Sequence, residues 1–156
     1  MQMISQKHLN DFGIPFAEIK KSAFRNLSTI FNKGCKLLTV DLSEMNPRCK
    51  PFYSAQMDRN FNPSLMLIDE VWDNVAKILK SDLIAVSIPS KDSICFSDMK
   101  LMESFRTMTG INEREYKDAE QKNLQLTQNI YVRKNGKWVL FLDTPEQMEE
   151  LWGDPL

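Results

Sequence analysis

The stretch LIAVSIPSKDSICF, residues 83–96, decides the fold. Two apolar runs rich in β-branched side chains, 83–88 and 93–96, flank the polar centre Pro89-Ser90-Lys91-Asp92. Short apolar runs bounded by turn residues are typical of buried strands, and Pro, Ser and Asp are turn-building residues. We therefore predict two antiparallel strands that are joined at Pro89–Asp92.

A second hairpin lies further along the chain, in NIYVRKNGKWVLFLD, residues 129–143. Asn135-Gly136 supplies the two positive φ angles that a type I′ turn requires. Because hairpins imply antiparallel pairing, the fold class is α+β, with an antiparallel sheet of about five to seven strands packed against helices. The 156 residues are predicted to form a single α+β domain, 1–156, which buries roughly 70% of its unfolded surface.

Local patterns predict the other elements. Strands are expected at 35–42, 52–57 and 64–67, and helices at 6–12, 15–31, 70–80, 99–109, 112–122 and 145–152. Asp69 and Asp98 are the predicted N-caps of two of these helices, and Gly110 is a predicted stop. The last helix has Thr144 as its cap, and Gln147 is expected to complete a capping box.

Two of these segments need further comment. Phe16, Ile19, Ala23 and Leu27 recur at helical spacing, which predicts that the helix following Pro15 buries one face. The segment 62–80 has two interpretations, which are one helix capped by Asn62 or a strand at 64–67 followed by a helix. We favour the second, because the helical period holds without the SLML run.

Composition excludes several classes of function. The chain has 20 basic and 21 acidic residues and a net charge of -1, whereas duplex nucleic-acid binding normally leaves a basic excess. No apolar run approaches the length of about 20 residues that a membrane span needs. The start, MQMISQKHLNDFG, lacks the apolar core of a signal peptide. We expect a cytoplasmic protein that binds neither nucleic acid nor membrane.

The residues that hold metals and cofactors are scarce. Cys35, Cys49, Cys95 and His8 are the only cysteines and histidine, and their spacing matches no zinc motif. We predict free thiols, a surface histidine and no metal. With five glycines the chain has no phosphate-binding glycine loop, so no cofactor is expected.

Two polar groups remain as candidate sites. Ser90, Lys91 and Asp92 form either a structural turn or a binding loop, and the turn chemistry favours the first interpretation. Asp69 and Asp73 lie four residues apart on one helix face, where they either bind a divalent cation or interact favourably with the helix dipole. The dipole interpretation is the simpler one.

The segment MDRNFNPSLMLIDEVWDNVAKILKSDLIAVSIPSKDSICFSD, residues 57–98, resembles the signature region of the uncharacterised YtpQ-like family. The matching positions are Asp58, Asn60, Ser64 and Pro89–Asp92 there, Ala23 and Asn26 near the start, and LTQNIYV at 126–132. Lys91 stands where the family pattern has arginine, and a lysine holds an anion less well than a guanidinium fork. The family has no established activity, so the resemblance implies no reaction.

These features favour a non-enzymatic protein-binding module, either chaperone-like or regulatory. The predicted order of elements is similar to that of small acidic α+β chaperones of type III secretion, which is an analogy of fold alone. Trp152, near the end of the chain, is the tryptophan expected to be available to a partner. The alternative is a hydrolase centred on the Pro89–Asp92 loop, with Ser90 and Asp92 as the reactive pair and Lys91 holding an anion.

Overall fold

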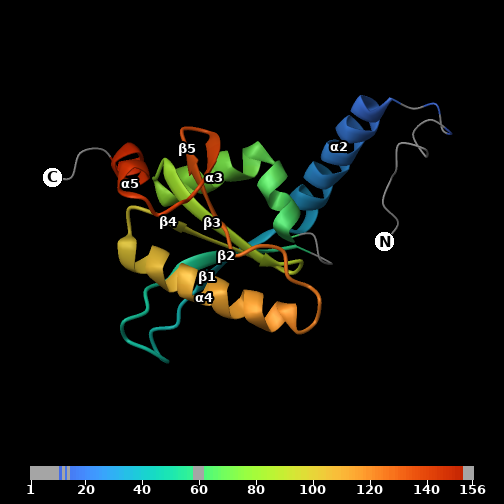
Figure 1. The fold of residues 1–156 in the computed structure, drawn as a ribbon. Coiled ribbons are helices and arrows are strands. Elements are labelled where there is room, and N and C mark those ends of the chain that lie inside the picture. Colours follow the sequence, from blue (N-terminus) through green and yellow to red (C-terminus); the bar gives the residue numbers. More distant parts are fainter. Residues whose placement is uncertain (1–10, 12, 14, 58–61, 153–156) are drawn as a thin grey trace.

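The computed structural model describes residues 11, 13, 15–57 and 62–152 (Figure 1). The predicted helix at 6–12 and His8 lie outside these residues, apart from Asp11. The elements are α2 (Phe16–Gly34), β1 (Lys36–Val40), β2 (Phe52–Gln56), the 3-10 helix η1 (Asn62–Leu67), α3 (Asp69–Leu79), β3 (Leu83–Ser90), β4 (Ser93–Asp98), α4 (Met102–Glu120), β5 (Ile130–Lys134), β6 (Lys137–Leu140) and α5 (Pro145–Trp152).

The six strands form one open antiparallel sheet in the order β1-β2-β4-β3-β5-β6. β3 and β4 come from the 83–96 stretch, occupy the two central positions and are buried along most of their length. This arrangement confirms the predicted α+β class and the predicted number of strands. The central hairpin therefore organises the sheet.

One face of the sheet, which we call the first face, is covered by η1 and α3. Trp72 of α3 anchors this layer, since its ring meets Phe96 and Trp138 edge-on at centroid distances of 5.6 and 5.3 Å. The indole N–H donates to the carbonyl oxygen of Leu65 in η1 at 2.8 Å. A buried indole that finds its hydrogen-bond partner fixes both packing and orientation, so this residue ties η1 and α3 to the sheet.

The second face is covered mainly by α4, which lies on the opposite side of the strands from α3 (Figure 1). Phe105 and Met108 of α4 pack on Leu83 and Ala85 of β3 in a second buried cluster, which Leu151 of α5 joins. Alternate residues of β3 therefore serve opposite faces, as the pleat of a strand requires. The small side chain of Ala85 leaves room for the bulky side chains of α4.

Three of the predicted elements, a strand and two helices, differ in the structure. Residues 64–67 belong to the 3-10 helix η1 and not to a strand, because the chain turns at Asn62-Pro63 and the Leu65 carbonyl is held by Trp72. The helices predicted at 99–109 and 112–122 are one continuous helix, α4. Gly110 does not end it, because Met108 and Ile111 on either side of the glycine pack in the second cluster and hold the helix on the sheet.

Two N-caps and one packing prediction are also wrong. Ile68 and Leu101 occupy the N-cap positions of α3 and α4, in place of Asp69 and Asp98. Asp98 instead accepts hydrogen bonds from the Ser81 hydroxyl at 2.7 Å and the Lys100 N–H at 2.9 Å. The first turns of α2 are not buried, since Phe16 is 64% exposed and this part of the helix extends away from the sheet (Figure 1).

The end of the chain combines a confirmed cap with a redirected side chain. Asn135 and Gly136 have φ angles of 50° and 77°, which confirms the predicted turn. Thr144 caps α5 by accepting the Gln147 N–H at 3.3 Å. The Gln147 side chain does not return to Thr144, so the capping box is not formed. Trp152 is half-buried against the second cluster rather than free.

Candidate functional site

The polar centre of the 83–96 stretch forms the tip of the β3–β4 hairpin. Ser90 pairs with Ser93, and Lys91 and Asp92 alone make the turn. The Asp92 N–H donates to the Ser90 hydroxyl at 3.3 Å, which is the local side-chain bond typical of serine in turns. The predicted hairpin connection is confirmed, but Pro89 and Ser90 belong to the strand rather than to the turn.

The tip is held from its other side by residues 124–126. The Lys91 N–H donates to the Leu124 carbonyl at 3.0 Å, and the Leu126 N–H donates to the Pro89 carbonyl at 2.9 Å. Between Ser87 and Ser90 the β3–β4 register shifts. A proline, which lacks an N–H, is tolerated in a sheet at such irregularities. The tip is therefore fixed in place and is not a free loop.

Asn62 holds the tip against the rest of the sheet. Its side-chain Nδ2 donates to the Asp92 carbonyl at 2.5 Å, and its Oδ1 accepts the Met57 N–H at 2.6 Å. The side chain thus joins the end of β2 to the hairpin, and Asn62 is only 8% exposed. Sequence patterns indicated Asn62 solely as a possible helix cap. The Asn-Pro pair that opens η1 was the local signal of a fixed turn.

A hollow of about 340 Å³ lies between the hairpin tip and the C-terminal half of α4. Its lining comprises Ser90, Asp92, Ser93, Glu115, Asp118, Ala119, Lys122 and Leu124. The Ser93 hydroxyl donates to the Glu115 carboxylate in a short hydrogen bond. We call this surface the tip hollow. Ser90 and Asp92 do meet there, but Lys91 is not part of it.

The chemistry available in the tip hollow is limited. Among the described residues, its lining has three carboxylates and one ammonium group, and it contains no histidine, cysteine or arginine. Beneath it, burial and the nearby Glu115 charge raise the pKa of the Cys95 thiol to about 12. Since the thiolate is the reactive form of cysteine, burial and the raised pKa both disfavour Cys95 as a nucleophile. The Ser93–Glu115 pair is the contact in the hollow that places a carboxylate against a hydroxyl, which is the arrangement closest to an activated nucleophile.

The acidic pair Asp69 and Asp73 faces a cation that the chain itself supplies. Arg133 of β5 is buried, and its Nη2 lies 2.7 Å from Asp73 Oδ1 and 3.7 Å from Asp69 Oδ1. A buried guanidinium needs such partners, so these carboxylates attach α3 to β5. Across the described part of the chain, no group of three or more His, Cys, Asp or Glu residues has an arrangement that could hold a metal ion.

The two edges of the sheet differ in their protection. At β6, the Gln147 side chain donates to the Leu140 carbonyl and accepts the Leu142 N–H, both at 2.6 Å. One side-chain amide thus takes the place of a neighbouring peptide group. At the other edge, β1 pairs with β2 alone among the described strands, and Leu37 and Leu38 are each 41% exposed. We call the outer side of β1 the open edge.

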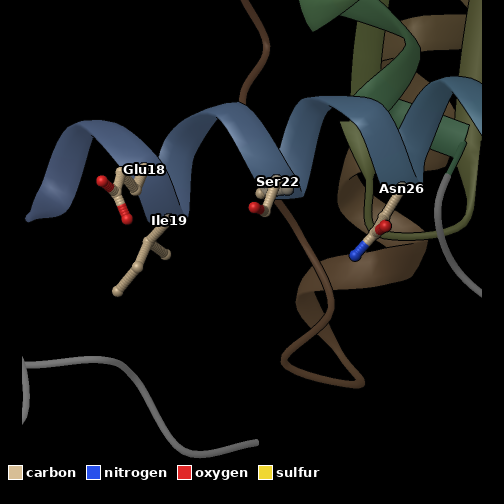
Figure 2. Close-up of a pocket in the computed structure, with 5 residues that line it drawn as sticks. Glu18, Ile19, Ser22 and Asn26 are labelled. Carbon is tan, nitrogen blue, oxygen red and sulfur yellow. The ribbon is translucent and has the colours of Figure 1, made fainter. Parts of the chain in front are cut away.

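A further hollow, of about 470 Å³, lies beside α2. Figure 2 shows Glu18, Ile19, Ser22 and Asn26 on the side of the helix that borders it. All of the described residues that line this hollow belong to α2. Within the described part of the chain it is therefore one helix face and not a set of chemical groups from several elements.

Comparisons with protein-family models, with curated proteins and with solved structures gave no match. None of the helices in the described ranges combines the length and the apolar content needed to cross a bilayer. Cys35, Cys49 and Cys95 are all free thiols. Two surfaces remain as candidate sites, the tip hollow with its polar lining and the open edge with its exposed leucines.

Proposed function

We propose that this chain is a non-enzymatic, cytosolic protein-binding module, and that an extended segment of its partner adds to the sheet at the open edge. The observation that carries the proposal is the contrast between β1, whose outer side is exposed, and β6, where Gln147 occupies the Leu140 carbonyl and the Leu142 N–H at the end of the strand. In strand addition, main-chain hydrogen bonds supply affinity and alternate side chains supply specificity.

The composition of β1 supports this role. Proteins usually protect exposed edge strands with prolines, charges, bulges or a covering element. β1 has the sequence KLLTV, with one charge at its first position and no proline. Leu37 and Leu38 point to opposite faces of the sheet, because successive residues of a strand alternate. An added strand would therefore contact an exposed leucine on each face.

A chaperone-like role follows the same geometry, with the open edge holding an extended segment of a client protein. We also propose that the chain is related to the YtpQ-like family. Of the residues that carry the resemblance, Pro89–Asp92 form the hairpin tip and Ser64 lies two residues after Asn62, which bonds to that tip. Asp58 and Asn60 fall outside the described residues.

Site-specific photo-crosslinking tests the proposed function. A photoreactive residue in place of Leu38 is expected to form adducts with partner proteins in cell extract, and mass spectrometry should map them to extended segments. The matched control is the same residue at Leu140, which is 39% exposed but lies on the β6 edge. Equal adducts at both positions, or none at Leu38, would contradict binding at the open edge.

The second candidate function is a hydrolase centred on the Pro89–Asp92 loop. The observation that favours it is the Ser93–Glu115 hydrogen bond, which places a carboxylate against a hydroxyl beside Ser90 and Asp92. A carboxylate next to a hydroxyl is one element of nucleophilic catalysis, although a complete site also needs donors for the developing oxyanion. If Ser93→Ala, Ser90→Ala and Asp92→Ala each leave a detected hydrolase activity unchanged, this candidate is eliminated.

A further inference from the structure

We propose that the open edge is occupied by a second copy of this chain, with the two β1 strands paired antiparallel about a two-fold axis at Leu38. This second copy would be the partner in the proposed binding function, and its placement rests on the same edge. Pairing in this way would join two six-stranded sheets into one continuous sheet. Two-fold symmetric contacts use the same patch on both copies, so the patch must be complementary to itself.

The sequence of β1 meets this condition. With Leu38 on the axis, Leu38 lies opposite Leu38 of the second copy, and Leu37 lies opposite Thr39 of the second copy. Each exposed leucine thus gains a cross-strand neighbour from the second copy, Leu38 on one face of the sheet and Leu37 on the other. Residues directly opposite each other have Cβ atoms about 4.5–5.5 Å apart, which is apolar contact distance.

Charge placement also suits this register. Lys36 is the only charged residue of β1, and it lies opposite Val40 of the second copy. The two Lys36 side chains are separated by four strand positions, which is about 13 Å at about 3.3 Å per residue. This distance exceeds the screening length of about 8 Å at physiological ionic strength, so their repulsion is weak.

The first test is the mass of the protein in solution, with charged substitutions on the axis. The wild-type chain is expected to sediment as a dimer. Leu38→Lys and Leu38→Glu should each be monomeric, because like charges then face each other on the axis, and an equimolar mixture of the two should form a heterodimer. Leu140→Lys, at a similarly exposed position on the β6 edge, should leave the dimer intact.

The second test fixes the register by disulfide formation, in a chain whose Cys35 and Cys49 are replaced by serine. Leu38→Cys should form an intermolecular disulfide on mild oxidation, because opposed Cα atoms lie about 4.5–5.5 Å apart, within disulfide reach. Thr39→Cys should not, because the two cysteines are then two positions out of register and about 8 Å apart. This test also covers the case in which a charged variant fails to fold.

A wild-type chain that is monomeric at all concentrations would overturn the self-pairing proposal. So would a mixture of the Leu38→Lys and Leu38→Glu variants that stays monomeric although both variants are folded. Equal disulfide yields from Leu38→Cys and Thr39→Cys would overturn the proposed register. Adducts at Leu38 with a different protein, combined with a monomeric chain, would leave strand addition standing and remove only the second copy as its occupant. If no adduct of any kind forms at Leu38, both proposals fail.

Discussion

Replacing Asn62 with alanine should destabilise the protein far more than the same replacement of an exposed asparagine would. The Asn62 side chain satisfies the Met57 N–H at 2.6 Å and the Asp92 carbonyl at 2.5 Å. Met57 is buried, so its N–H would lose its partner without gaining access to water. Asp92 is exposed, so its carbonyl would recover a water molecule.

The magnitude follows from these two environments. A buried donor left without a partner costs about 1–3 kcal/mol, whereas a hydrogen bond lost at an exposed carbonyl costs about 0.5–1.5 kcal/mol. We expect Asn62→Ala to lower the free energy of unfolding by about 2–4 kcal/mol in total. With a urea slope of about 2 kcal/mol per molar, the unfolding midpoint should fall by about 1–2 M.

Urea denaturation measures the global effect, and amide hydrogen exchange at Met57 measures the local one. Asn46→Ala is the matched control, since the Asn46 side chain accepts the Arg48 N–H at 3.1 Å on the exposed surface. Its effect should stay within about 0.5 kcal/mol. The expectation is refuted if Asn62→Ala is no more destabilising than Asn46→Ala, or if the Met57 amide remains as protected as in the wild type.

Three further predictions concern Asp73, Gln147 and Cys95, and each has its own measurement. Asp73→Asn should lower the free energy of unfolding by about 1–2 kcal/mol and more than Asp69→Asn does, because Asp73 is the closer partner of the buried Arg133; equal losses in thermal melts would contradict this. Gln147→Ala should lower the free energy of unfolding by about 1–2 kcal/mol and make the chain prone to associate through β6. Light scattering would detect this association, and the control variant Gln128→Ala should not show it. Cys95 should not react with thiol reagents at pH 8 until the chain unfolds. Because the pKa of this thiol is raised from 9.0 to about 12 in the folded protein, the free energy of unfolding should fall as pH rises between these values. A Cys95→Ala variant should lose that part of the pH dependence.

The centre of the fold was predictable because its signals are local. The strands on either side of Pro89–Asp92 and the turn at Asn135-Gly136 are each specified by residues within a few positions of one another. The continuity of α4 was not predictable in this way. Gly110 is a poor helix former by roughly 0.5–1 kcal/mol, and packing of Phe105 and Met108 on the sheet outweighs that cost.

The candidate site shows the same division between local and long-range information. Sequence patterns identified Ser90 and Asp92 because they are turn residues between two strands. Glu115 and Asp118 were missed, because only the packing of α4 on the sheet brings them to the hairpin tip. Likewise, the spacing of Asp69 and Asp73 was evident, but their partner Arg133 lies 60 residues after Asp73.

The amide of Gln147 has a consequence for the size of any assembly. Growth into a ribbon or fibre by edge-to-edge pairing needs two unpaired sheet edges on every subunit. Among the described strands the β6 edge is less available than the β1 edge, because the Gln147 side chain already occupies the Leu140 carbonyl and the Leu142 N–H at its end. Pairing through the sheet is therefore expected to favour the β1 edge, and a pair joined there leaves only the partly blocked β6 edges at its two ends.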